Sequence, residues 1–145
     1  MSYKKLLIAV DDSPFAAHAA DAGVDLARQL GAEVAFVTVV DPALTQSAAD
    51  SGLPAEWWLA HAQRDAKSLL NDFKSRAALT PPALEFLETG KPAKKIVETA
   101  KNWPADMIVM GTHGRGAIGS FMIGSVAQGV MRNAHCPVMI LRAQK

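Results

Sequence analysis

The sequence predicts a single doubly wound α/β domain, in which helices cover both faces of a parallel β-sheet. Short apolar runs alternate with longer stretches of helical spacing along the whole chain. A chain of 145 residues, 50% of them hydrophobic, is long enough to bury one core and too short for two ordinary domains. In a compact domain, regular β-α alternation requires right-handed crossovers and parallel strands. We therefore treat residues 1–145 as one domain.

The first predicted strand is the continuous apolar run Leu6–Val10, as expected for a strand covered on both faces. Ser13-Pro14 then resembles a helix start, with a capping residue before proline at the first helical position. Small and apolar residues recur at helical spacing until Gly31, which is placed to end this helix. The β-branched run Val34–Val40 predicts the second strand, which stops at Asp41-Pro42.

The middle of the chain begins with a predicted loop, Ala43–Pro54, which is rich in small and polar residues. Glu56–Leu79 has the spacing of a long amphipathic helix, and Thr80-Pro81-Pro82 is expected to end it. Leu84, Phe86 and Leu87 then mark a third strand. This segment adds one helix and one strand to the predicted alternation.

The last part of the chain contains two further helices and two further strands. Pro92–Asn102 is a shorter helical pattern that begins with proline, and the apolar run Met107–Met110 follows as the fourth strand. After a glycine-rich segment, Ser125–Asn133 has helical spacing, and Pro137–Leu141 predicts the fifth strand. The predicted order is therefore β-α-β-α-β-α-β-α-β.

Composition excludes several classes of protein. The net charge is +1, and the basic residues are scattered, which disfavours nucleic acid as a partner. No run of about twenty apolar residues is present, so no membrane-spanning helix is expected. Cys136 is the only cysteine, and the first apolar run ends at Asp11-Asp12 without the features of a signal peptide. These observations predict a cytoplasmic location.

The glycine-rich segment is the most informative part of the chain for function. Six of the ten glycines lie within residues 111–129, directly after an apolar strand and across the start of a helix. Glycine lets the main chain approach a ligand closely, and the first turn of a helix offers unpaired N–H donors. No acidic residue follows Asp106. This pattern predicts a site for phosphate.

The predicted topology brings the turns after four strands to one edge of the sheet, where ligands bind in doubly wound folds. Asp11 follows the first strand, Asp41 the second, Gly90 the third and Gly111 the fourth. The sequence therefore predicts a crevice that combines an acid, apolar strand ends and a phosphate loop.

With these motifs the chain resembles the universal stress proteins of the UspA superfamily over its whole length. The specific signature is the pattern G-x2-G-x9-G-(S/T), which is met by Gly111, Gly114, Gly124 and Ser125. Supporting features are Val10-Asp11-Asp12-Ser13 in the first turn and His135-Cys136-Pro137-Val138 before the last strand. The resemblance implies a five-stranded parallel sheet in the order 3-2-1-4-5, a homodimer formed through the last strand, and ATP binding.

The resemblance also implies a role for individual residues. Adenine would lie near Ala9, Val10 and Val39, and Asp11 would face the ribose or a bound Mg²⁺. Met110 and Gly111 would flank the nucleotide, and Gly114 would let the triphosphate approach. Gly124, Ser125 and Val126 would hold the β- and γ-phosphates. Mg²⁺ is typically bound through substrate phosphates and one or two carboxylates, which suits such a site.

The leading interpretation is an ATP-binding regulatory stress protein with an unknown protein partner, in which nucleotide occupancy acts as a switch. Hydrolysis should be slow or absent, since the motifs assign no base and no arginine finger. Two alternatives stay open: a nucleotide-independent interaction dimer whose glycines are only structural, and an enzyme such as a slow ATPase or nucleotidyl transferase. The sequence does not decide between ATP, AMP and a cyclic nucleotide.

Several side chains also have a purely structural interpretation. Asp11 or Asp12 is expected to act at a helix N-terminus, and His135 at a helix C-terminus. Cys136 is expected to be a small buried core residue, since no partner base is apparent. For Trp57-Trp58, one ring could belong to the core while the other covers the crevice or meets a partner.

Overall fold

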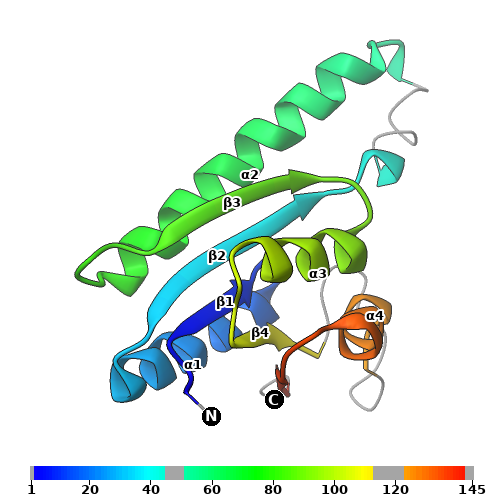
Figure 1. Ribbon diagram of the computed structural model, residues 1–145. Helices are drawn as coiled ribbons and strands as arrows, with labels where there is room; N and C mark the ends of the chain where they lie inside the picture. The colour runs from blue at the N-terminus through cyan, green and yellow to red at the C-terminus, as the bar shows by residue number, and fades with distance from the viewer. Residues whose placement is uncertain (1, 45–50, 113–122, 143–145) are drawn as a thin grey trace.

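A computed structural model describes residues 2–44, 51–112 and 123–142. The strands are β1 (Lys5–Ala9), β2 (Glu33–Val40), β3 (Leu84–Thr89), β4 (Met107–Gly111) and β5 (Val138–Leu141). The helices are α1 (Pro14–Leu30), α2 (Ala55–Ala77), α3 (Pro92–Asn102) and α4 (Ser125–Asn133). All five strands are parallel neighbours in one sheet, in the order β3-β2-β1-β4-β5. The predicted fold class and strand order are confirmed (Figure 1).

The sheet separates two hydrophobic cores, because consecutive side chains of a strand point to opposite faces. Leu6 and Ile8 of β1 belong to the core under α1 and α2, whereas Leu7 belongs to the core under α3 and α4. All three side chains are completely buried. Figure 1 accordingly shows α3 and α4 on the face turned to the viewer and α1 behind the sheet.

Backbone geometry ends α1 as predicted and ends α2 earlier than predicted. Gly31 caps α1 in the left-handed conformation, with φ of 67°. The predicted C-terminus of α2 at Leu79 is wrong, because Ala78 adopts φ of 47° and its N–H bonds to the carbonyl of Lys74. The helix therefore ends at Ala77, before the prolines are reached.

Several strand boundaries differ from the predictions by one residue. β1 ends at Ala9, since Val10 makes a single hydrogen bond, from its N–H to the carbonyl of Val37 (2.9 Å), and no longer pairs in register. A short 3-10 turn over residues 42–44 leads into the predicted loop Ala43–Pro54, of which residues 45–50 lie outside the described ranges.

Within the described residues, no helix is long and apolar enough to cross a membrane.

Candidate functional site

The carboxyl edge of the sheet opens where β1 and β4 separate. Their register runs from Leu6 opposite Met107 to Ile8 opposite Val109 and stops there. Both strands continue beyond that point, to Ala9 and to Gly111. In the observed strand order, connections leave β1 on one side and β4 on the other, so this gap is the topological switch point. The predicted residues Ala9, Val10, Met110 and Gly111 therefore flank the gap from both sides.

The backbone of Val39 offers a hydrogen-bond donor and acceptor at the same edge of the sheet, on the β2 side of the end of β1. The carbonyl of Val37 faces β1, and the carbonyl of Val40 bonds to Gly90 N–H on the β3 side (2.9 Å). Peptide groups of alternate residues point the same way along a strand, so the N–H and C=O of Val39 face β1. In-register pairing has already ended there, and neither group has a hydrogen-bond partner among residues 2–44, 51–112 and 123–142.

One oxygen of the Asp11 carboxylate is hydrogen-bonded within the turn between β1 and α1. Its Oδ1 accepts hydrogen bonds from the backbone N–H of Ser13 (2.9 Å) and from the Ser13 hydroxyl. Ser13 is the N-cap residue of α1, as predicted, but its side chain makes no capping bond to the helix. The turn holds the Asp11 carboxylate at the mouth of the gap, with Oδ2 outside these two bonds.

The start of α4 is tied to the end of β4. The backbone N–H of Gly124 donates to the carbonyl of Thr112 (2.7 Å), and Thr112 N–H donates to the carbonyl of Leu141 in β5 (2.9 Å). Gly124 is the N-cap of α4, which begins at Ser125. The first-turn N–H groups, including those of Ser125 and Val126, have no carbonyl within their own helix to bond. They lie at the same sheet edge as Gly111.

Helix dipoles make this edge favourable for anions. The strands are parallel and each helix returns from their carboxyl ends, so the helix N-termini collect along this edge. Three of these N-termini, those of α1, α3 and α4, carry no acidic residue in the first turn. The positive ends of these dipoles are thus left uncompensated by carboxylates of their own first turns.

One predicted site residue lies outside the described ranges. Gly114 falls within residues 113–122, so its placement relative to the gap stays a prediction. Within the described ranges, no group of three or more His, Cys, Asp or Glu side chains could hold a metal ion. A cation at Asp11 would therefore need most of its ligands from the nucleotide phosphates or water.

Sequence reasoning missed two residues that hold the edge of the crevice. Gln63 of α2 donates from its side-chain amide to the hydroxyl of Thr89, the last residue of β3 (3.0 Å). This bond fixes α2 to the carboxyl end of the sheet. The only available signal was that a polar residue interrupts the helix face that turns toward the strands.

Cys136 and His135 are placed differently from their structural predictions. Cys136 is half-buried and packs against the core under α3 and α4, so it is a partly exposed core residue rather than a buried one. Burial, followed by the nearby Asp106 carboxylate, raises its pKa above the usual thiol value, while a hydrogen bond with the Ile108 backbone acts in the opposite direction. His135 lies beyond the end of α4 at Asn133, because Ala134 is already extended.

The two adjacent tryptophans both lie outside the buried core. Trp57 is 43% exposed and Trp58 is partly exposed, because both sit in the first turn of α2. Trp57 meets Trp58 edge-on, with 4.8 Å between ring centroids, and stacks on His61 at 5.4 Å. Trp58 also donates to the Ser51 hydroxyl (3.2 Å).

Comparison with known proteins extends these observations. The sequence profile of the Universal stress protein family matches residues 2–142. A universal stress protein of Methanocaldococcus jannaschii is 37% identical over 149 aligned residues, which cover 99% of this chain and 84% of the relative.

Solved structures show the same fold. The universal stress protein UspA of Lactobacillus plantarum superposes with a TM-score of 0.82 at 26% identity, covering 98% of this chain and 99% of that one. A universal stress protein in complex with cAMP superposes with a TM-score of 0.68 at 24% identity, covering 99% of this chain and all of the other.

Proposed function

Since the chain belongs to the universal stress protein family, a family of stress-response proteins, we propose that it is a regulatory ATP-binding protein. Nucleotide occupancy acts as the switch, and hydrolysis is slow or absent. The observation that carries this proposal is that the end of β1 lies between the Val39 peptide groups, unpaired within the described residues, on the β2 side and Gly111, near the start of α4, on the β4 side.

The Val39 backbone suits adenine. The Watson–Crick edge of adenine presents an amino donor at N6 next to an acceptor at N1. A carbonyl and an N–H that face the same way can satisfy both groups, so the Val39 peptide groups match the adenine pattern. Ala9 and Val10, at the end of β1, add apolar contacts next to Val39. Guanine and hypoxanthine present the reverse pattern and would meet carbonyl against carbonyl.

The phosphates would extend toward α4. Gly111 at the end of β4 has no side chain to block this path, and the first turn of α4 offers the N–H groups of Ser125 and Val126. Gly124 stands at the N-cap, where its own N–H is engaged by Thr112 and only its missing side chain favours close approach. Met110 and Gly114 complete the proposed set, the latter from outside the described ranges.

Magnesium is proposed as a companion of the nucleotide. Asp11 has one carboxylate oxygen held by Ser13 and the other available, which fits a single protein ligand to a phosphate-bound ion. When bound, the ion would neutralise phosphate charge. As a ligand to the ion, the Asp11 carboxylate would not serve as a general base, which favours binding over turnover.

Two further parts of the proposal concern the assembly and its location. β5 is an edge strand with half-buried side chains, which supports a homodimer formed through this strand. The single cysteine favours the cytoplasm, where ATP is available. A protein partner, not identified by the sequence, would bind differently to the nucleotide-bound and the nucleotide-free forms.

The proposal is tested by identifying nucleotide released from freshly purified, denatured protein, and by calorimetric titration of the emptied protein. ATP with Mg²⁺ is expected to bind with a dissociation constant on the order of 10 μM. ITP is the matched control, because it keeps the ribose and triphosphate and reverses the hydrogen-bonding edge of the base. We expect ITP to bind at least about tenfold more weakly, corresponding to roughly 1.4 kcal/mol.

AMP and cAMP complete the titration series, since a protein of this fold has been solved with cAMP. If cAMP bound more tightly than ATP, cAMP would replace ATP as the proposed ligand, and the proposed adenine site would be kept. Absence of binding to any adenine nucleotide would overturn the proposal in favour of a nucleotide-independent interaction dimer. A hydrolysis rate well above that of ATP alone, followed for hours, would make the protein an ATPase instead of a switch.

A further inference from the structure

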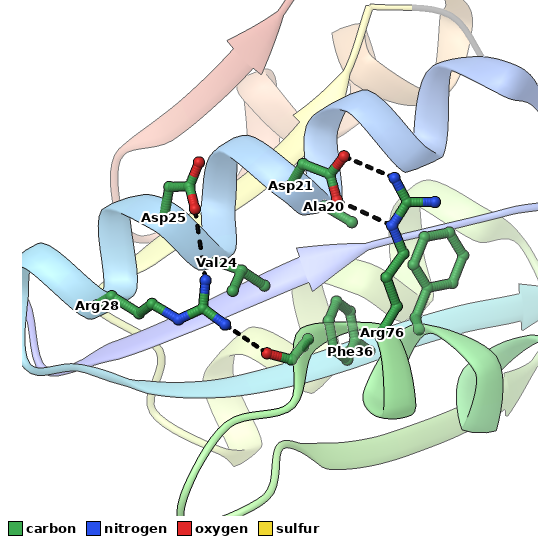
Figure 2. A pocket seen from close by; sticks show the side chains of 9 residues that line it. Ala20, Asp21, Val24, Asp25, Arg28, Phe36 and Arg76 are labelled. Atoms are coloured by element: carbon green, nitrogen blue, oxygen red, sulfur yellow. Dashed lines mark hydrogen bonds and ion pairs between the residues drawn. The ribbon is translucent and has the colours of Figure 1, made fainter.

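A second crevice lies between α1 and α2, away from the carboxyl edge of the sheet. It has a volume of about 230 Å³ and is bounded by residues 20–28 of α1, by the C-terminal end of α2 and by β2 beneath them. Figure 2 shows its lining side chains: Ala20, Asp21, Val24, Asp25, Arg28, Phe36, Phe73, Arg76 and Ala77. It is separate from the proposed nucleotide site, which adjoins the opposite end of α1.

The floor of the crevice is apolar. Ala20, Val24, Phe73 and Ala77 are each less than 10% exposed, and Phe36 lies beneath them, tilted against Phe73 with 5.8 Å between ring centroids. A closed apolar cavity of roughly 150 Å³ is large enough to take a benzene molecule. The space available here is therefore sufficient for one aromatic ring.

Two guanidinium groups and the carboxylates of Asp21 and Asp25 form the rim. Arg76 of α2 reaches across to Asp21 of α1 with two hydrogen bonds, from Nε (3.1 Å) and Nη2 (2.7 Å). Arg28 of α1 reaches in the other direction and donates from Nη2 to the carbonyl of Ala77 (2.6 Å). Figure 2 shows these two side chains approaching the crevice from opposite helices.

The rim has hydrogen-bonding capacity left over. Each guanidinium carries five N–H donors. Arg28 uses one on Ala77, and its remaining contact, to Asp25, is a loose 3.6 Å ion pair. Both arginine side chains are more than half exposed, at 52% for Arg28 and 58% for Arg76, so they can turn outward and uncover the apolar floor.

An apolar slot beneath two planar cations, each in contact with an aspartate, suits a flat ring whose anionic group can take the place of those carboxylates. A guanidinium binds carboxylate through parallel N–H···O bonds and stacks on aromatic faces. We propose that the crevice between α1 and α2 binds a small aromatic carboxylate, whose ring rests over Phe73 while its carboxylate bonds to Arg28 and Arg76. This proposal does not depend on nucleotide binding at the sheet edge.

The test is a titration of the full-length protein with benzoate, followed by ¹H–¹⁵N NMR. Benzyl alcohol has the same ring without the charge and serves as the ligand control. Saturable shifts are expected for the amides of Ala20, Val24 and Ala77, with a dissociation constant on the order of 1 mM, as suits so small a ligand. Benzyl alcohol should bind at least about fivefold more weakly.

Variants test which side chains supply the positive charge that binds the carboxylate. Arg28→Met and Arg76→Met should each weaken benzoate binding about fivefold or more, whereas Arg64→Met, at an exposed position elsewhere on α2, should leave it unchanged. Arg76→Lys keeps the positive charge and serves if Arg76→Met does not fold. Shifts that do not saturate, that centre on Val39, or that are equal for benzoate and benzyl alcohol would overturn the proposal.

Discussion

The backbone N–H of Gly124 donates to the carbonyl of Thr112 across only 2.7 Å, although residues 113–123 separate the two in the chain. One is the residue after β4 and the other the N-cap of α4. This single bond sets where the helix begins relative to the sheet. It therefore links the fold directly to the proposed phosphate site.

The first prediction concerns this bond. Gly124 has φ of −62°, which proline adopts without strain, so Gly124→Pro removes the N–H donor while it preserves the local backbone angle. We expect ATP affinity to fall about tenfold and stability to fall by about 1 kcal/mol, because the hydrogen bond from residue 124 to the Thr112 carbonyl is lost. Calorimetry and urea unfolding measure the two effects.

Gly124→Ala is the matched control, because alanine keeps the N–H and tolerates the same φ. Its stability should stay within about 0.5 kcal/mol of the parent. Equal ATP affinity for the parent and Gly124→Pro would show that the bond does not position α4 for phosphate.

Sequence signals that lie within single helices and strands predicted most of the fold. α3 and α4 match their predicted bounds, Pro92–Asn102 and Ser125–Asn133, because proline at the first helical position and glycine at the N-cap are local signals. The early end of α2 was missed because Ala78 adopts a left-handed conformation, which the presence of alanine in a sequence does not predict. Conformations imposed by tertiary context have no such local signal.

The candidate site was predicted in part for a similar reason. Topology brought the end of the first strand and Gly111 together, the family resemblance singled out Ala9, Val10 and Met110, and the structure shows these four residues at the carboxyl edge. The point at which β1 and β4 separate is a property of two segments about one hundred residues apart. No pattern within either segment encodes that point, and the free Val39 peptide groups follow from the same kind of long-range geometry.

The second prediction concerns Cys136. Because burial and Asp106 raise its pKa in the folded protein, the thiolate is scarcer in the folded state than in the unfolded state. Any stabilisation from this shift is complete below the unfolded thiol pKa, roughly 8.5, and is lost as pH rises through the folded pKa. We expect iodoacetamide to modify native protein at least about tenfold more slowly than urea-unfolded protein at pH 8.

Asp106→Asn provides the control for this prediction, since it removes the carboxylate charge named as the second cause of the shift. Alkylation of the native variant should be faster than that of the parent. Equal native and unfolded rates in the parent would contradict the environment assigned to Cys136.

The third prediction tests the proposed dimer. Pro137 and Leu141 direct their carbonyls to β4, so by alternation the N–H of Ile140 faces the open edge of β5. Ile140→Pro removes this outward N–H without removing a bond to β4, and is expected to give a monomer in analytical ultracentrifugation. Ile140→Val is the control that keeps the N–H and should remain dimeric. A parent protein that is already monomeric, or an Ile140→Pro dimer, would place the assembly elsewhere.

The fourth prediction concerns the close approach of α3 and α4. A Cβ atom added to Gly129 would lie 2.7 Å from the Cβ of Ala93, closer than two carbon atoms can pack. Alanine is favoured over glycine in a helix interior by about 1 kcal/mol, but the clash should prevail. We expect Gly129→Ala to lower the free energy of unfolding by about 1–3 kcal/mol.

Ala93→Gly together with Gly129→Ala separates the clash from other effects, because the double variant moves the methyl group from one helix to the other. If steric contact is the cause, the double variant should recover at least about 1 kcal/mol relative to Gly129→Ala in a double-mutant cycle. Additive losses would contradict direct contact between these two positions. Since α4 begins only four residues before Gly129, Gly129→Ala should also weaken ATP binding, and the double variant should restore it.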